Sequence, residues 1–116
     1  MLKVELWRLE ELAGILDDLT FTLRVRNQPE WAGVFSHFLD ELNRITSAET
    51  AAPDELRRLA RNIQSCCVSS RTFNTLQFEE KDAPERAALN RRFSRDRACL
   101  LQALGEIEKR LVEYVN

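Results

Sequence analysis

The fold is decided by residues 82–114, DAPERAALNRRFSRDRACLLQALGEIEKRLVEY. Apolar side chains recur along this stretch at the spacing of one face of an α-helix, namely Leu89, Phe93, Leu100, Leu104, Ile107, Leu111 and Tyr114. Asp82 followed by Pro84 and Glu85 is typical of the first turn of a helix. At 1.5 Å per residue, the stretch predicts a helix about 45 Å long.

Three shorter helices are predicted before it, over about residues 3–26, 29–47 and 53–66. The first carries a broad apolar face, because leucines recur every seven positions at Leu2, Leu9, Leu16 and Leu23, with Leu6 beside them. In the second, Trp31, Phe35 and Phe38 share one stripe, and we expect these rings to be mostly buried. Pro29 and Pro53 suit the first turns of the second and third helices.

The stretch from Val68 to Lys81 keeps no helical period and is predicted to be a long irregular connection. Only three Gly and three Pro occur in 116 residues, which disfavours frequent turns and supports long helices. We therefore predict one all-α domain over 1–116, a helical bundle of four main helices. The first, second and last helices are expected to form the principal core, with a short third helix.

The overall charge and the apolar pattern exclude several classes of function. Seventeen Lys and Arg against nineteen Asp and Glu give a net charge of −2, which provides no general attraction to nucleic acid. No apolar run is long enough to span a membrane, and charges interrupt the first residues, unlike a signal peptide. We therefore expect a cytoplasmic protein without a membrane partner, whose three cysteines are reduced.

The residues that could support catalysis are few. His37 is the only histidine, and Glu41 one turn later could assist it in acid–base chemistry, but no nucleophile lies beside it in the sequence. Cys66 and Cys67 lack the spacer of usual zinc pairs and are better explained by burial at a helix end. We therefore expect no enzyme activity, no metal and no cofactor.

Acidic side chains gather at two places. Asp17 and Asp18, with Glu10 and Glu11, form a strip on the first helix. Glu79, Glu80 and Asp82 form a second cluster at the end of the connection, with Phe73 and Asn74 nearby as contact or anchoring residues. Solubility alone can explain both clusters, and the functional alternative is electrostatic steering of a basic protein partner. The connection cluster is the first choice for the partner site, and the Asp17–Asp18 strip competes with it.

An arginine-rich segment offers a different function. Arg86, Arg91, Arg92, Arg95 and Arg97 lie on the last helix, so a dimeric regulator that binds nucleic acid is the alternative. These arginines spread around the helix and alternate with Glu85 and Asp96, which favours a solvated, salt-bridged face. A homodimer through the last helix is a third hypothesis.

The order of several residues resembles a family of small uncharacterised bacterial helical proteins, some of them encoded beside secreted polymorphic toxins. The matching positions are Trp31-Ala32, Ile63, Ser69-Ser70, Phe73-Asn74-Thr75-Leu76 and Asn90. The resemblance implies an immunity-type role, in which the protein neutralises a cognate toxin by binding it. It implies no catalytic residues, and an acidic binding surface would suit a toxin with a basic, nuclease-type active site.

Overall fold

The computed structural model describes residues 4–47, 53–69, 73, 76 and 82–115. These residues form the helices α1 (Leu6–Val25), α2 (Pro29–Ser47), α3 (Pro53–Ser69) and α5 (Ala83–Val115). The all-α bundle expected from the sequence is thereby confirmed. Most of the expected connection lies outside the described residues.

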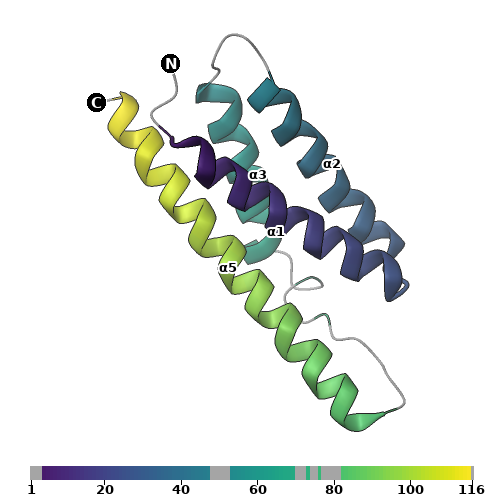
Figure 1. The fold of residues 1–116 in the computed structure, drawn as a ribbon. Coiled ribbons are helices and arrows are strands. Elements are labelled where there is room, and N and C mark those ends of the chain that lie inside the picture. Colours follow the sequence, from purple (N-terminus) through teal and green to yellow (C-terminus); the bar gives the residue numbers. More distant parts are fainter. Residues whose placement is uncertain (1–3, 48–52, 70–72, 74–75, 77–81, 116) are drawn as a thin grey trace.

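The four helices pack as a ring in which each has two neighbours (Figure 1). The packed pairs are α1 with α2, α1 with α5, α3 with α5, and α2 with α3. As expected, α3 is the shortest of these four helices, but it runs to Ser69 instead of ending near residue 66, and it belongs to the core because it lies against both α2 and α5. Buried Cys67 continues its apolar stripe one turn beyond Ile63, which explains the extra length.

The turn between α1 and α2 follows from its residue types. Asn27 has a φ of 61°, a left-handed conformation that asparagine tolerates better than most residues. The N–H of Gln28 donates to the carbonyl of Leu23 at 2.8 Å, and the N–H of Asn27 donates to that of Arg24 at 3.3 Å. This pair of bonds is a Schellman motif, which ends α1 and lets Pro29 begin α2.

The core is built mainly from leucines of α1, α3 and α5 and from phenylalanines. The fully covered side chains include Leu12, Leu16, Leu19, Leu23, Leu56, Ile63, Leu100, Leu104, Ile107 and Leu111. The predicted core position Leu6 needs correction, because its side chain is 62% exposed. The aromatic stripe on α2 is mostly buried as expected: Phe35 is fully buried, and Trp31 and Phe38 are partly buried and pack against the core.

Phe73 closes the core between α2 and α5. Its ring centroid lies 5.0 Å from Trp31, 5.0 Å from Phe35 and 5.6 Å from Phe93. Arg97 covers this cluster, since its Nη1 donates to the Phe73 carbonyl at 3.1 Å and its guanidinium lies 5.0 Å from the Phe93 ring. Of the described residues of the predicted connection, Phe73 is therefore part of the central packing, and Leu76 packs against the core as well.

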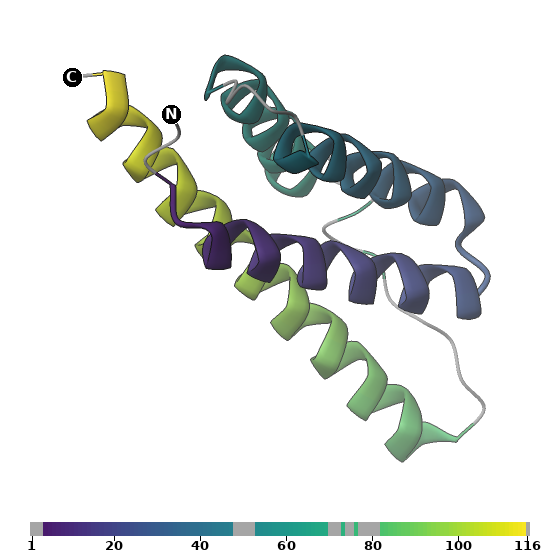
Figure 2. The same ribbon diagram turned by 45° about the horizontal axis from the view of Figure 1, so that its top comes forward.

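α5 determines the length of the molecule. Its 33 residues at 1.5 Å each span about 50 Å, which matches the longest dimension of 50 Å. The N-terminal part of α5 projects beyond the other helices, and residues 82–88 are all exposed (Figure 1). α1 crosses α5 at an angle, so the two helices diverge toward the start of α5 (Figure 2).

Candidate functional site

The residues expected to form a partner site at the connection differ in where the structure places them. Glu79, Glu80 and Asn74 lie outside the described residues. Asp82 is exposed immediately before α5. Phe73 is fully buried, so its role as a direct partner contact was wrong and its alternative role as an anchor of the connection holds. Aromatic packing therefore explains Phe73 without any partner.

The second acidic group is fully described and lies on α1. Asp17 and Asp18 are exposed, and so are Glu10 and Glu11, about two turns earlier. At about 100° per residue, Glu10 and Asp17 fall on one side of the outer face, and Glu11 and Asp18 on the other. The four carboxylates thus form two parallel pairs along α1.

α5 contributes one more carboxylate, Asp96. From the sequence, this residue was interpreted only as a group that neutralises the neighbouring arginines. Asp96 is half-buried, and its burial together with the nearby charge of Asp18 raises its pKa, while Arg95 and Arg92 act in the opposite direction. Acidic groups from two helices therefore meet where α1 crosses α5. Only packing brings them together, because Asp18 and Asp96 are far apart in the sequence.

The raised pKa of Asp96 predicts a pH-dependent effect of Asp96→Asn. A carboxyl whose pKa is raised on folding favours the folded state when protonated and loses this advantage as the pH rises through the folded pKa. Asp96→Asn should therefore increase the free energy of unfolding at about pH 7 and change it little at about pH 3. Urea unfolding at both pH values measures this, with Asp17→Asn as the exposed control.

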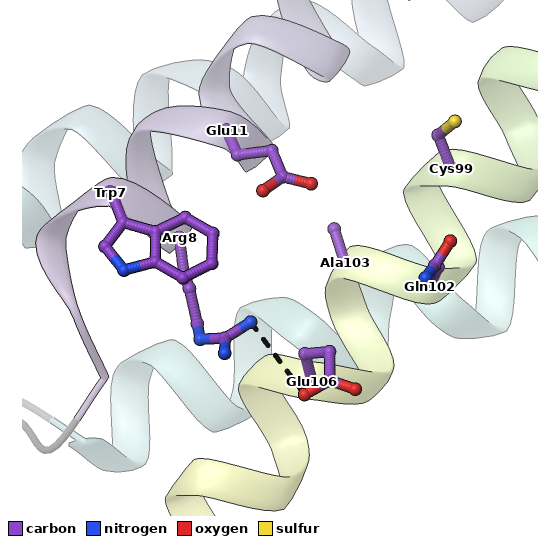
Figure 3. A pocket seen from close by; sticks show the side chains of 7 residues that line it. All are labelled: Trp7, Arg8, Glu11, Cys99, Gln102, Ala103 and Glu106. Carbon is purple, nitrogen blue, oxygen red and sulfur yellow. Dashed lines mark ion pairs between the residues drawn. The ribbon is translucent and has the colours of Figure 1, made fainter.

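A cleft lies beside this acidic crossing, between the first half of α1 and the second half of α5 (Figure 3). Its volume is about 430 Å³, and its lining residues are Trp7, Arg8, Glu11, Cys99, Gln102, Ala103 and Glu106. Arg8 lies 4.3 Å from the Trp7 ring centroid and 3.8 Å from Glu106 Oε2. It also pairs with Glu5 at 2.5 Å, so the guanidinium is held by side chains of both helices.

The cleft offers a thiol, and its lining residues include carboxylates but no imidazole. Cys99 is exposed in its wall, whereas His37 belongs to α2, does not line the cleft and pairs with Glu41 at 3.1 Å. Cys67 is buried, and burial raises its pKa to about 12, with the neighbouring Cys66 adding to the shift. A buried protonated thiol is a poor nucleophile.

These environments predict the order in which the cysteines react with a maleimide. Exposed Cys99 should be alkylated first, half-buried Cys66 more slowly, and Cys67 only after denaturation. Mass spectrometry of timed samples gives the order, and Cys99→Ser should remove the first step alone. Early labelling of Cys67 in the folded protein would contradict this arrangement.

The outer face of α1 also exposes large apolar side chains, which the sequence analysis missed. Trp7 is 53% exposed, Phe21 66% and Val25 55%. The signal was present in the sequence, since Trp7 and Phe21 are two heptads apart on the side opposite the leucines. We call Trp7, Gly14, Phe21 and Val25 the outer stripe.

The arginine-rich segment of α5 is divided by the fold. Arg91, Arg92 and Arg95 are exposed and line a depression of about 400 Å³. Arg97 instead turns toward the aromatic cluster and is half-buried. The nucleic-acid hypothesis used the arginines from Arg86 to Arg97, and the fold directs Arg97 away from the exposed ones.

Within the described ranges, no three His, Cys, Asp or Glu side chains lie close enough to hold a metal ion. None of the helices built from those residues is both long and apolar enough to cross a membrane. Comparisons of the chain with family models, with curated proteins and with solved structures gave no match.

Proposed function

We propose that the protein is a non-enzymatic binding module that acts in the cytoplasm and neutralises a basic bacterial toxin by direct contact. The observation that carries the proposal is the exposed acidic face of α1, which includes Asp17 and Asp18, with Asp18 close enough to Asp96 of α5 for their charges to interact. Acidic surfaces of this kind accelerate encounters with basic proteins and disfavour acidic ones. The order of residues that resembles small bacterial helical proteins, some of them encoded beside toxins, implies the same role.

The acidic face has a rigid support. Below it, α1 is packed through Leu12, Leu16 and Leu19, all fully buried, so the carboxylates are presented on an ordered helix. Binding sites on packed helices hold their geometry better than sites on loops. The cleft between α1 and α5 has no imidazole beside its thiol, and the proposal therefore assigns it no reaction.

The direct test is co-expression with the protein encoded by the adjacent upstream reading frame. If that neighbour is a toxin, its expression alone should stop growth, and co-expression with this protein should restore growth and yield a co-purifying complex. Restored growth without a complex would contradict neutralisation by binding. A toxic neighbour that this protein neither binds nor counteracts would contradict the proposal as a whole.

Nucleic-acid binding remains the second candidate, because Arg91, Arg92 and Arg95 share one exposed surface. A duplex DNA of random sequence should then bind with an affinity that falls steeply with salt. The double substitution Arg91→Ala with Arg95→Ala should reduce both the affinity and the salt slope, whereas Arg58→Ala on α3 should not. Both this function and the hypothesis of a structural homodimer require a dimer. Analytical ultracentrifugation of the same samples shows whether the dimer forms.

A further inference from the structure

We infer that the outer stripe of α1 is a docking face for a basic amphipathic helix of the partner protein. This inference rests on the proposed function and specifies the recognised element. It follows from three features of α1: exposed aromatic rings, an open position between them, and carboxylates along both sides.

The exposed rings are placed to hold one helix along its length. Trp7 and Phe21 are 14 residues apart, about 21 Å on the same face, and Val25 extends the stripe by one turn. Neither ring is needed to complete the core, because 53% of Trp7 and 66% of Phe21 remain exposed in the folded chain. Rows of exposed apolar residues at heptad spacing on one helix are typical of faces that bind another helix.

Gly14 opens the middle of the stripe. A Cβ added to Gly14 would meet no atom within 4 Å, so the space above it is unoccupied. A glycine inside a helix costs about 1 kcal/mol relative to alanine. In this position its missing side chain leaves a notch between Trp7 and Phe21, into which an apolar side chain of a partner helix can fit.

The carboxylates on both sides define the charge of the occupant. Glu10 and Asp17 follow one edge of the stripe, and Glu11 and Asp18 follow the other. A helix lying on the stripe brings the residues next to its own apolar row close to these carboxylates. Lys and Arg at those positions would pair with them, whereas Asp and Glu would be repelled.

The same charges argue against a second copy of this chain. Two α1 faces placed together would oppose four carboxylates with four others. The exposed arginines of α5 could neutralise them, but among the described residues 82–100 no large hydrophobic side chain is exposed to cover Trp7 and Phe21. A partner that combines an apolar row with basic flanks satisfies both requirements.

The first test uses a synthetic helix of about 18 residues with Leu at the two apolar positions of each heptad and Lys on both flanks. Titration into the ¹⁵N-labelled full chain should shift the indole N–H of Trp7 and the amides of Gly14, Phe21 and Val25. A peptide with Glu in place of Lys, and a scrambled Leu–Lys peptide, should cause much smaller shifts. Absence of shifts on α1, or equal shifts with the Glu peptide, would overturn the inference.

Variants of the stripe should act on binding and leave folding intact. Trp7→Ala and Phe21→Ala should each weaken peptide binding about tenfold or more, as is usual for central aromatic anchors. Gly14→Gln should weaken it by filling the notch, while the matched Gly33→Gln on α2, where the added side chain also meets open space, should not. Melting temperatures verify that each variant is folded, and unchanged affinity of all three stripe variants would refute the docking face.

The neutralisation assay separates this inference from the proposed function. If the wild-type chain neutralises the neighbouring toxin and Trp7→Ala with Phe21→Ala still does, the docking face is wrong and the function stands. If the peptide binds to α1 but no neighbour is neutralised, the docking face stands and the immunity role fails. Concentration-dependent sedimentation that Phe21→Ala abolishes would identify a second copy as the occupant and overturn the inference.

Discussion

Phe73→Ala is expected to lower the free energy of unfolding by about 3–5 kcal/mol. The ring has no exposed surface and contacts Trp31, Phe35 and Phe93 with centroid distances of 5.0 to 5.6 Å. Its removal deletes a large buried side chain and leaves a cavity between α2 and α5, which the helices cannot close without moving. For a domain of this size, the melting temperature should fall by about 10–20 °C.

Phe21→Ala is the matched control for this experiment. It removes the same side chain from a helix position where the ring is 66% exposed, so the free energy of unfolding should change by less than about 1 kcal/mol. Chemical denaturation of the three proteins under one set of conditions gives the comparison. Similar losses for both substitutions would show that Phe73 is not the central anchor of the connection.

The second large effect is expected for Asp17→Lys combined with Asp18→Lys. Reversal of two charges on the acidic face should slow association with the basic toxin by tenfold or more at low salt. The difference from wild type should shrink as salt is raised, because screening weakens attraction between exposed charges. Stopped-flow or surface-plasmon-resonance measurements at several salt concentrations determine the rates.

Asp40→Lys with Asp54→Lys makes the same change in net charge on α2 and α3, where both carboxylates are exposed. This control variant should associate at nearly the wild-type rate. Both double variants should keep their melting temperatures within a few degrees, since exposed charges contribute little to folding. If the control variant slows association as much as the α1 variant, net charge and not the α1 face controls the encounter.

The acidic clusters at Asp17–Asp18 and Glu79–Glu80 show how far candidate partner-binding sites can be ranked from the sequence alone. The α1 strip has four carboxylates and the connection cluster three, and the connection was the first choice because long connections commonly carry recognition. The structure describes the whole α1 strip but only Asp82 of the connection cluster, and beside the strip it adds Asp96 and the exposed rings of Trp7 and Phe21. Which side chains lie beside the α1 strip depends on the orientation of α1 in the bundle. A ranking of the two clusters from the sequence could not use this orientation.

The sequence by itself determined that the protein is helical and where the four described helices lie, the largest differences being the start of α1 at Leu6 and the end of α3 at Ser69. Helical periodicity and the prolines Pro29 and Pro53 at helix starts act over a few residues, so they can be recognised without knowing the fold. The end of α3 was placed too early because the apolar residue that extends it, Cys67, is buried by contacts with the bundle.

Only the tertiary structure decided which side chains meet and which stay exposed. Phe73 lies among the rings of α2 and α5, and Asp96 lies beside Asp18, because helices distant in the sequence pack against each other. α1 carries apolar residues on two opposite sides, and its neighbours α2 and α5 cover the leucines and leave Trp7 and Phe21 in solvent. Periodicity indicates that a helix has apolar faces, but the positions of the neighbouring helices determine which face is buried and which is available to a partner.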